Sequence, residues 1–194
     1  MATWGAIAGV GQTLLGLVAD ACPKPEFSNA AFQLYQGEDF KTPLEEGVSL
    51  YLYRVEINGT HRNLVQRQTV DGRRFLPSLP LDLHYLLTPW AKDAAKQQRL
   101  LGWCMRALED TPILPSGLLN HFCPDPETFR SSETVELVAE PLSLQDLTNI
   151  WDTFKPTVQL SAGYVVRMVV IDSDRDLSDG APVQTRAFQF ASVP

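Results

Sequence analysis

The stretch GVSLYLYRVEIN, residues 47–58, is rich in Val, Ile, Leu and Tyr and is bounded by Gly47 and the turn-forming pair Asn58-Gly59. This composition predicts a β-strand. If its side chains alternate strictly, one face carries Val48, Leu50, Leu52, Arg54 and Glu56, and the other carries Ser49, Tyr51, Tyr53, Val55 and Ile57. Both faces are mostly apolar, so we expect the strand to lie inside a sheet rather than at its edge.

Three other segments have the spacing of apolar side chains that is typical of amphipathic helices. The first precedes Pro23 and lacks the Lys and Arg residues that begin a signal peptide. Its apolar positions are Trp4, Ile7, Gly11, Leu14 or Leu15, and Val18. The second helix is predicted at residues 91–110 and the third at residues 144–154, with a short helical turn at residues 116–122.

Strands are also predicted at residues 81–90, 133–140 and 159–172, and the alternation in the first of them indicates a half-buried strand. Residues 59–80 contain an Asp71-Gly72 turn signal and indicate a long loop or a loose hairpin. Residues 173–194 read as an acidic loop and a terminal strand. This order predicts an α+β fold, a single domain over residues 1–194 with a mixed or mainly antiparallel sheet packed by helices.

The formal net charge of −7 disfavours nucleic acid and anionic lipid as partners. Three cysteines without a CxxC motif indicate neither a disulfide framework nor a zinc site, which fits a reducing compartment. A possible phosphate loop has Ala6 and Gln12 in place of the required Gly and Lys. A possible calcium loop after Asp172 has Leu177 in place of its Gly. We therefore expect no cofactor and no metal, and no membrane insertion.

One enzymatic hypothesis rests on Asp82 and His84, which share one face of a predicted strand. Ser78 or Ser116 would then supply the nucleophile of a small hydrolase. The chain has no G-x-S-x-G turn, and such pairs arise often by chance. The interpretation we favour is a polar strand face that is turned to solvent or to a partner, with no catalytic residues.

Arginines are concentrated between residues 54 and 74. Arg54, Arg62, Arg67, Arg73 and Arg74 make a basic segment on an acidic protein, which suggests an acidic protein partner or an ordinary solvated loop. Arg54 and Arg167 each interrupt an apolar strand face, so we expect both guanidinium groups to be half-buried and paired with a carboxylate. An intramolecular ion pair is the default, and a contact across subunits is the alternative.

The predicted helix at residues 144–154 favours recognition over acid/base catalysis. Ser143 and Asp146 form a capping arrangement, and Leu144, Leu147, Ile150, Trp151 and Phe154 form an apolar stripe. Asp146 and Asp152 lie roughly 120° apart around the axis and about 9 Å along it, so they cannot converge on one substrate. Asp152, near the negative helix end, calls for a cation such as Lys155 or a partner. We expect Gln145, Asn149 and Asp152 to form a contact surface.

Four blocks of this sequence, taken in order, resemble a known family. They are VSLYLYRVEIN followed by RNL, LPLDLHYLLTPWA, LGWCMRALEDTPIL, and the long run from Glu140 to Asp172. Together they are similar to the amino-terminal domain of cap, or tail-terminator, proteins. Those proteins belong to phage-tail-like contractile injection systems of the virulence-cassette and antifeeding-prophage type.

The resemblance implies a non-enzymatic protein that forms a ring, expected to be a hexamer, on the last layer of the inner tube and sheath. Such a ring ends polymerisation and fixes particle length. The implied partners are further copies of the chain and the tube and sheath proteins, with assembly in the cytoplasm as part of a particle that is later released or attached to a membrane. Another tube or baseplate adaptor of the same particle, or the hydrolase above, stays as an alternative.

Overall fold

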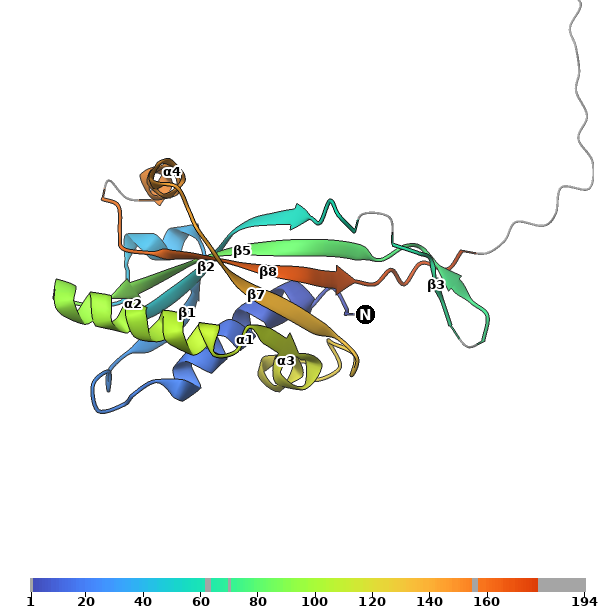
Figure 1. Ribbon diagram of the computed structural model, residues 1–194, viewed down its shortest axis with the longest axis horizontal. Helices are drawn as coiled ribbons and strands as arrows, with labels where there is room; N and C mark the ends of the chain where they lie inside the picture. The colour runs from blue at the N-terminus through green and yellow to red at the C-terminus, as the bar shows by residue number, and fades with distance from the viewer. Residues whose placement is uncertain (1, 62–63, 70, 155–156, 178–194) are drawn as a thin grey trace, which may run out of the picture.

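The computed structural model describes residues 2–61, 64–69, 71–154 and 157–177. Its main sheet has six strands in the order β1-β2-β5-β8-β7-β6 (Figure 1). In chain order they are β1 (Ala31–Tyr35), β2 (Gly47–Ile57), β5 (Leu79–Trp90), β6 (Ile113–Pro115), β7 (Thr134–Glu140) and β8 (Ala162–Ile171). β1 and β2 are parallel, and the other neighbouring pairs are antiparallel. The predicted α+β fold with a mainly antiparallel sheet is confirmed.

Helices cover both faces of this sheet (Figure 1). On one face lie α1 (Ala6–Ala21), α2 (Ala94–Glu109) and α3 (Ser116–Phe122), whose apolar side chains join the sheet in a large core. On the other face lie α4 (Leu144–Phe154) and the short 3-10 helix η1 (Gly37–Lys41), which build a small aromatic core around Phe40, Trp90 and Trp151. The helices predicted from apolar spacing are all present.

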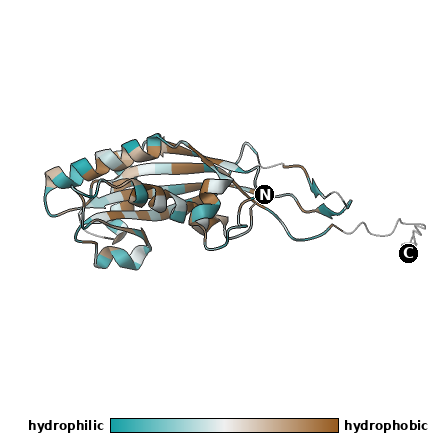
Figure 2. Cartoon of the chain, turned by 90° about the horizontal axis from the view of Figure 1, so that it is seen from below, coloured by the Kyte–Doolittle hydropathy of each residue, from teal (hydrophilic) through white to brown (hydrophobic). Residues whose placement is uncertain are grey.

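Strand β5 contributes to both cores at once. Leu83 and Tyr85 point into the large core, whereas Leu86 and Trp90 point into the small core, and all four are buried. The prediction of a half-buried strand is therefore wrong, because α4 and η1 cover the face that was expected to meet solvent. Figure 2 shows apolar residues along the central strands and polar residues on the small outlying strands.

Helix α1 lies close to α3, and its glycines explain why its apolar run is interrupted. A Cβ atom at Gly16 would lie 2.2 Å from the ring of Phe122. Only a residue without a side chain permits that approach. Gly16 thus marks a close contact between α1 and α3, which is consistent with the predicted packing helix.

A two-stranded hairpin, β3 (Arg67–Gln68) and β4 (Arg74–Phe75), projects from one end of the sheet (Figure 1). Residues 172–177 run beside β4, where the Leu76 N–H donates to the Arg175 carbonyl and the Leu177 N–H donates to the Arg74 carbonyl. We call the hairpin and residues 172–177 the arm. The loose hairpin is confirmed, whereas the predicted terminal strand lies outside the described residues, in 178–194.

Gly47 is the first residue of β2 and lies directly against the backbone of β1. Its φ is +147°, and a Cβ there would lie 2.0 Å from the backbone oxygen of Ala31. Both the backbone conformation and the space therefore require glycine. The parallel β1–β2 pair depends on this contact.

We predict that Gly47→Ala lowers the free energy of unfolding by about 3 kcal/mol, because the added methyl group meets backbone that cannot rotate away. The matched control is Gly102→Ala on the exposed side of α2, where a Cβ meets nothing within 4 Å. That change should raise stability by about 0.5–1 kcal/mol through helix propensity. Urea denaturation of both variants checks the pair, and equal midpoints would contradict this account.

Candidate interaction surfaces

Strand β2 contains a β-bulge that changes which side chains share a face. Leu52 pairs with Tyr85 and Arg54 pairs with His84, so Tyr53 is an extra residue in the ladder. Such an insertion shifts the alternation of the rest of the strand. Arg54 and Glu56 therefore lie on the small-core side with His84, and the predicted faces are wrong beyond the bulge. Strict alternation in the sequence did not reveal this shift.

The bulge assembles a compact polar group that we call the bulge cluster: Tyr53, Arg54, Glu56, His84 and Glu140. Glu140 is its centre, since it accepts a hydrogen bond from the Tyr53 hydroxyl at 2.9 Å and lies 2.8 Å from His84 Nδ1. Arg54 Nη2 lies 3.6 Å from Glu140 Oε1, and Arg54 Nε lies 3.3 Å from Glu56 Oε1. The intramolecular ion pair expected for Arg54 is present.

Electrostatics at Tyr53 support a structural reading of this cluster. Burial is the main cause that raises the pKa of the Tyr53 hydroxyl well above its ordinary value, and the hydrogen bond to Glu140 raises it further. Tyr53 therefore stays a neutral donor at any physiological pH. A phenol held in that state is a fixed hydrogen-bond donor and not a proton acceptor.

Asp82 fixes a second irregularity, in strand β8. Leu81 pairs with Val169 and Leu83 with Val166, so β8 has an extra residue opposite Asp82. Met168 in this bulge has a φ of +62°, and its N–H donates to Asp82 Oδ1 at 3.1 Å. The side-chain amide of Asn58 donates to the same carboxylate at 2.9 Å. One carboxylate therefore holds the β8 bulge and the end of β2 together.

The structure gives the residues of the hydrolase hypothesis separate partners. His84, which is 5% exposed, belongs to the bulge cluster, and Asp82 belongs to the β8 bulge. The Ser78 hydroxyl donates to Asp172 Oδ1 at 2.7 Å. Ser116 begins α3, on the opposite face of the sheet. These contacts do not form a nucleophile–base–acid chain.

We predict that Asp82→Ala lowers the free energy of unfolding by about 1–3 kcal/mol, because it leaves the Met168 N–H and the Asn58 amide without their acceptor. Asp152→Ala is the matched control, since Asp152 is exposed on α4 and should change stability by less than about 0.5 kcal/mol. Thermal unfolding compares the two variants. An Asp82→Ala variant as stable as the unaltered chain would contradict the role of Asp82 in holding the β8 bulge.

Helix α4 begins as the sequence predicts. The Ser143 hydroxyl oxygen accepts from the Asp146 N–H at 3.1 Å, and the hydroxyl donates back to Asp146 Oδ2 at 2.6 Å. The apolar stripe is confirmed from Leu147 onward and includes the fully buried Trp151. Leu144 departs from the stripe with 78% of its surface exposed. As the first helical residue, its side chain points back beyond the helix start, away from the small core.

The outer side of α4 is polar, and we call Gln145, Asn149 and Asp152 the α4 face. All three are exposed, and Gln145 Nε2 donates to Asn149 Oδ1 at 2.9 Å. Asn149 also lines a hollow of about 270 Å³ together with Arg54, Glu140 and Asp146. Two interface candidates from distant segments, Arg54 and Asn149, are thereby brought to one place.

Of the other basic candidates, three lie in the arm and one lies in β8. In the arm, Arg67 Nε lies 3.4 Å from Asp172 Oδ2 and its guanidinium lies over the Phe75 ring, so this side chain is engaged within the chain. Arg73 pairs with Asp71 at 3.2 Å, and Arg74 lies in β4. Arg167 is exposed on β8 and not half-buried as predicted, because it lies in the bulged part of that strand. Arg62 and Lys155 lie outside the described residues.

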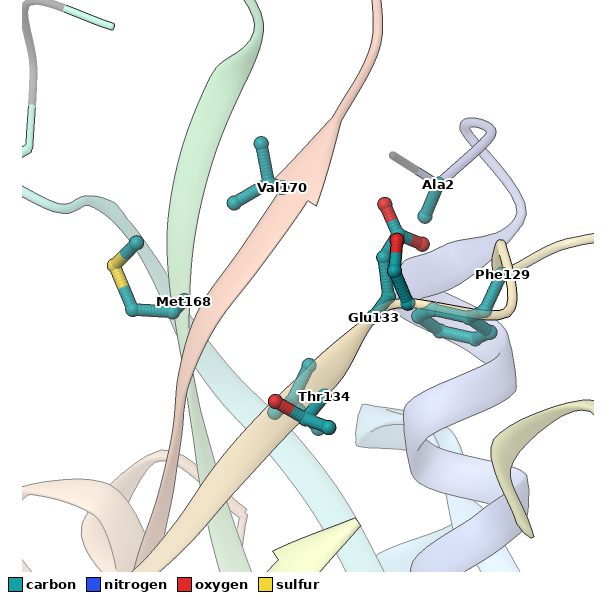
Figure 3. Close-up of a pocket in the computed structure, with 8 residues that line it drawn as sticks. Ala2, Phe129, Glu133, Thr134, Met168 and Val170 are labelled. Atoms are coloured by element: carbon teal, nitrogen blue, oxygen red, sulfur yellow. The ribbon is translucent and has the colours of Figure 1, made fainter. Parts of the chain in front are cut away.

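A small hollow of about 230 Å³ lies between the amino-terminal segment, β7 and β8 (Figure 3). Its labelled side chains are mostly small or apolar, and the one labelled acid, Glu133, accepts from the Arg130 N–H at 3.0 Å. Throughout the described ranges, His, Cys, Asp and Glu side chains form no group of three suited to a metal ion. Nor does any helix described here have the length and hydropathy of a membrane span.

Sequence reasoning missed an apolar groove beside the start of α1. Trp4, predicted to pack inward, precedes the helix and is 83% exposed. Together with Ile7, Leu34, Leu52 and others it lines a hollow of about 330 Å³. Helical spacing could not indicate this, because Trp4 lies two residues before the first residue of the helix. We call this surface the β2 groove.

Comparison with known proteins identifies the family. The profile described as the Pvc16 N-terminal domain matches residues 9–185, nearly the whole chain. The chain belongs to the Pvc16 N-terminal domain family. The match of this Pvc16 domain begins within α1 and extends past β8, so it includes the β2 bulge, the β8 bulge and α4.

Two solved structures share the fold of this Pvc16 domain. One is the sheath/tube terminator of an extracellular contractile injection system, PVC, in the extended state, with a TM-score of 0.64 and 15% identity over 96% of this chain. The other is the tube-terminating cap of the anti-feeding prophage, with a TM-score of 0.53 and 15% identity over 92%. This chain covers 64% and 59% of those two proteins. No curated protein sequence gave a significant match.

Proposed function

We propose that this protein is a structural cap of a contractile injection particle, which forms a ring on the last layer of tube and sheath and ends its growth. The observation that carries the proposal is the fold itself, shared over 96% of the chain with a sheath/tube terminator. Family membership over residues 9–185 supports the same function. The ring is expected to be a hexamer assembled in the cytoplasm, with tube and sheath proteins as partners.

A cap must combine two kinds of surface. It needs a contact between unlike patches on neighbouring copies, whose rotation closes into a ring, and it needs one ring face that fits the tube end. The opposite face must not offer a new tube end. A chain with a polar helix on one sheet face, an apolar groove near the other and an arm at one end has the asymmetry that this requires.

The α4 face is our candidate for contact with the tube or sheath. Gln145, Asn149 and Asp152 are exposed, adjacent and rigidly mounted, because Trp151 anchors the same helix in the small core. The neighbouring hollow presents Arg54 and Glu140 beside Asn149, so the surface offers charges of both signs. In this proposal the α4 face serves for recognition, and the protein is not an enzyme.

The direct test is the length of particles seen by electron microscopy in cells with and without this protein. Loss of the cap should give long, ragged or sheathless tubes, because growth would lack its stop. Particles of unchanged length would contradict the function. Gold labelling of a tagged chain separates a cap from a baseplate adaptor, since the cap must lie at the end away from the baseplate.

A single charge reversal tests the α4 face. Asp152→Lys should lengthen particles while leaving the chain folded, because it inverts the charge of a recognition surface near the end of a helix. Asp20→Lys is the matched control, since Asp20 is exposed near the end of α1, on the other face of the sheet. Both changes suit the helix dipole equally. Normal lengths with both variants would exclude Asp152 from the contact.

A further inference from the structure

The outer half of β2 has a strand partner on one side alone. β1 pairs with β2 only between Gly47 and Tyr51, where β1 ends at Tyr35. From Leu52 to Ile57, β2 pairs with β5, and no other strand in the described part of the chain lies along its outer side. The backbone N–H and C=O groups of this half form an open edge of the kind that another extended chain can pair with.

The β2 groove lies beside this open edge. Leu52 lines it, and Val55 follows Leu52 on the same face because the bulge removes one step of the alternation. Val55 and Ile57 are 44% and 54% exposed, which is high for apolar side chains in a sheet. An open backbone edge beside an apolar groove fits an extended segment whose alternate side chains are apolar.

We propose that the outer half of β2 binds residues 183–190 of a second copy of this chain as an added strand. Their sequence is VQTRAFQF, in which Phe188 and Phe190 are two residues apart. In an extended chain such residues share one face. The two aromatic rings would then fill the groove beside Trp4 and Leu52 while the backbone pairs with β2.

The course of the chain favours a second copy over the same copy. Residues 172–177 run along the arm, away from the sheet (Figure 1), and can carry the chain about 20 Å past Ile171. The five residues 178–182 span at most about 17 Å. They are too short to reverse direction and bring residue 183 back to Ile57, which lies two strands away across β5. The arm thus directs the segment toward a neighbouring molecule.

This contact joins unlike patches, a terminal segment and a groove, which is the type of contact that forms a ring when the rotation between neighbouring copies closes. The inference rests on the proposed cap function, which requires a ring. It adds the two surfaces that neighbouring copies would use, the terminal segment and the open half of β2, which the family resemblance does not give. It also accounts for the exposed apolar side chains of Val55 and Ile57 along the open half of β2.

Complementation between two defective variants tests the contact. Val55→Lys places a charge on the open half of β2, next to the groove, and the double change Phe188→Asp with Phe190→Asp damages the segment. Each variant alone should have a dissociation constant for self-association raised roughly tenfold or more, measured by sedimentation velocity on the full chain. An equal mixture should form dimers and nothing larger, because one intact segment meets one intact groove and the remaining ends are both defective.

Val158→Lys is the matched control, because Val158 is 42% exposed and lies neither in β2 nor in the groove lining, and it should associate as the unaltered chain does. A second measurement uses a synthetic peptide of residues 181–192, which should bind the Phe188/Phe190 variant and not Val55→Lys. A monomeric mixture, unaltered association of Val55→Lys, or a monomeric unaltered chain would overturn the proposal. If any of these results were found together with overlong particles in the deletion strain, the strand contact would be refuted and the cap function would still be supported.

Discussion

The burial of β5 on both faces is the constraint on which the rest of this molecule depends. Its ladders with β2 and β8 align the three long strands, and its side chains enter the large and the small core alternately. A strand in this position cannot slip by one residue without exchanging its two sets of side chains. The helices that carry the proposed contacts are therefore held at fixed places on the two faces.

Both strands that pair with β5 contain a β-bulge. β2 bulges at Tyr53, and β8 bulges at Met168, on either side of the segment from Leu81 to Tyr85. Bulges increase local twist and redirect side chains. Here the β2 bulge turns Arg54 toward Glu140 and places Val55 and Ile57 on the same face as Leu52. The polar cluster near α4 and the exposed apolar side chains beyond Leu52 are thus two results of one irregularity.

The sequence was sufficient for the elements whose pattern is long and regular. Helix α4, with its Ser143 cap and buried Trp151, and strand β2 follow from composition and spacing alone. The five-residue β1 and the three-residue β6 were not predicted, because so few residues carry no readable period. The bulges were missed for a different reason. A bulge is defined by the partner strand, and no local pattern in residues 47–58 records which residue lies opposite.

The candidate site was predictable only in part. Gln145, Asn149 and Asp152 could be placed on one exposed helix side, because helical geometry relates near neighbours in the chain. The meeting of Arg54 with Asn149, and of Trp4 with Leu52, joins segments that are far apart in sequence. The ion pair of Arg67 and the exposure of Arg167 likewise depend on which residues lie near them in the folded chain.

The open half of β2 also has a consequence for the supply of subunits. A bare strand edge beside apolar side chains is a template for any extended chain, including partly folded copies of itself. Free copies of the chain can then be lost to aggregation, and the rate of this loss rises steeply with their concentration. Under the proposed cap function, production of the protein in small amounts would avoid that loss. The geometry of one strand edge would thereby favour a low concentration of free chains.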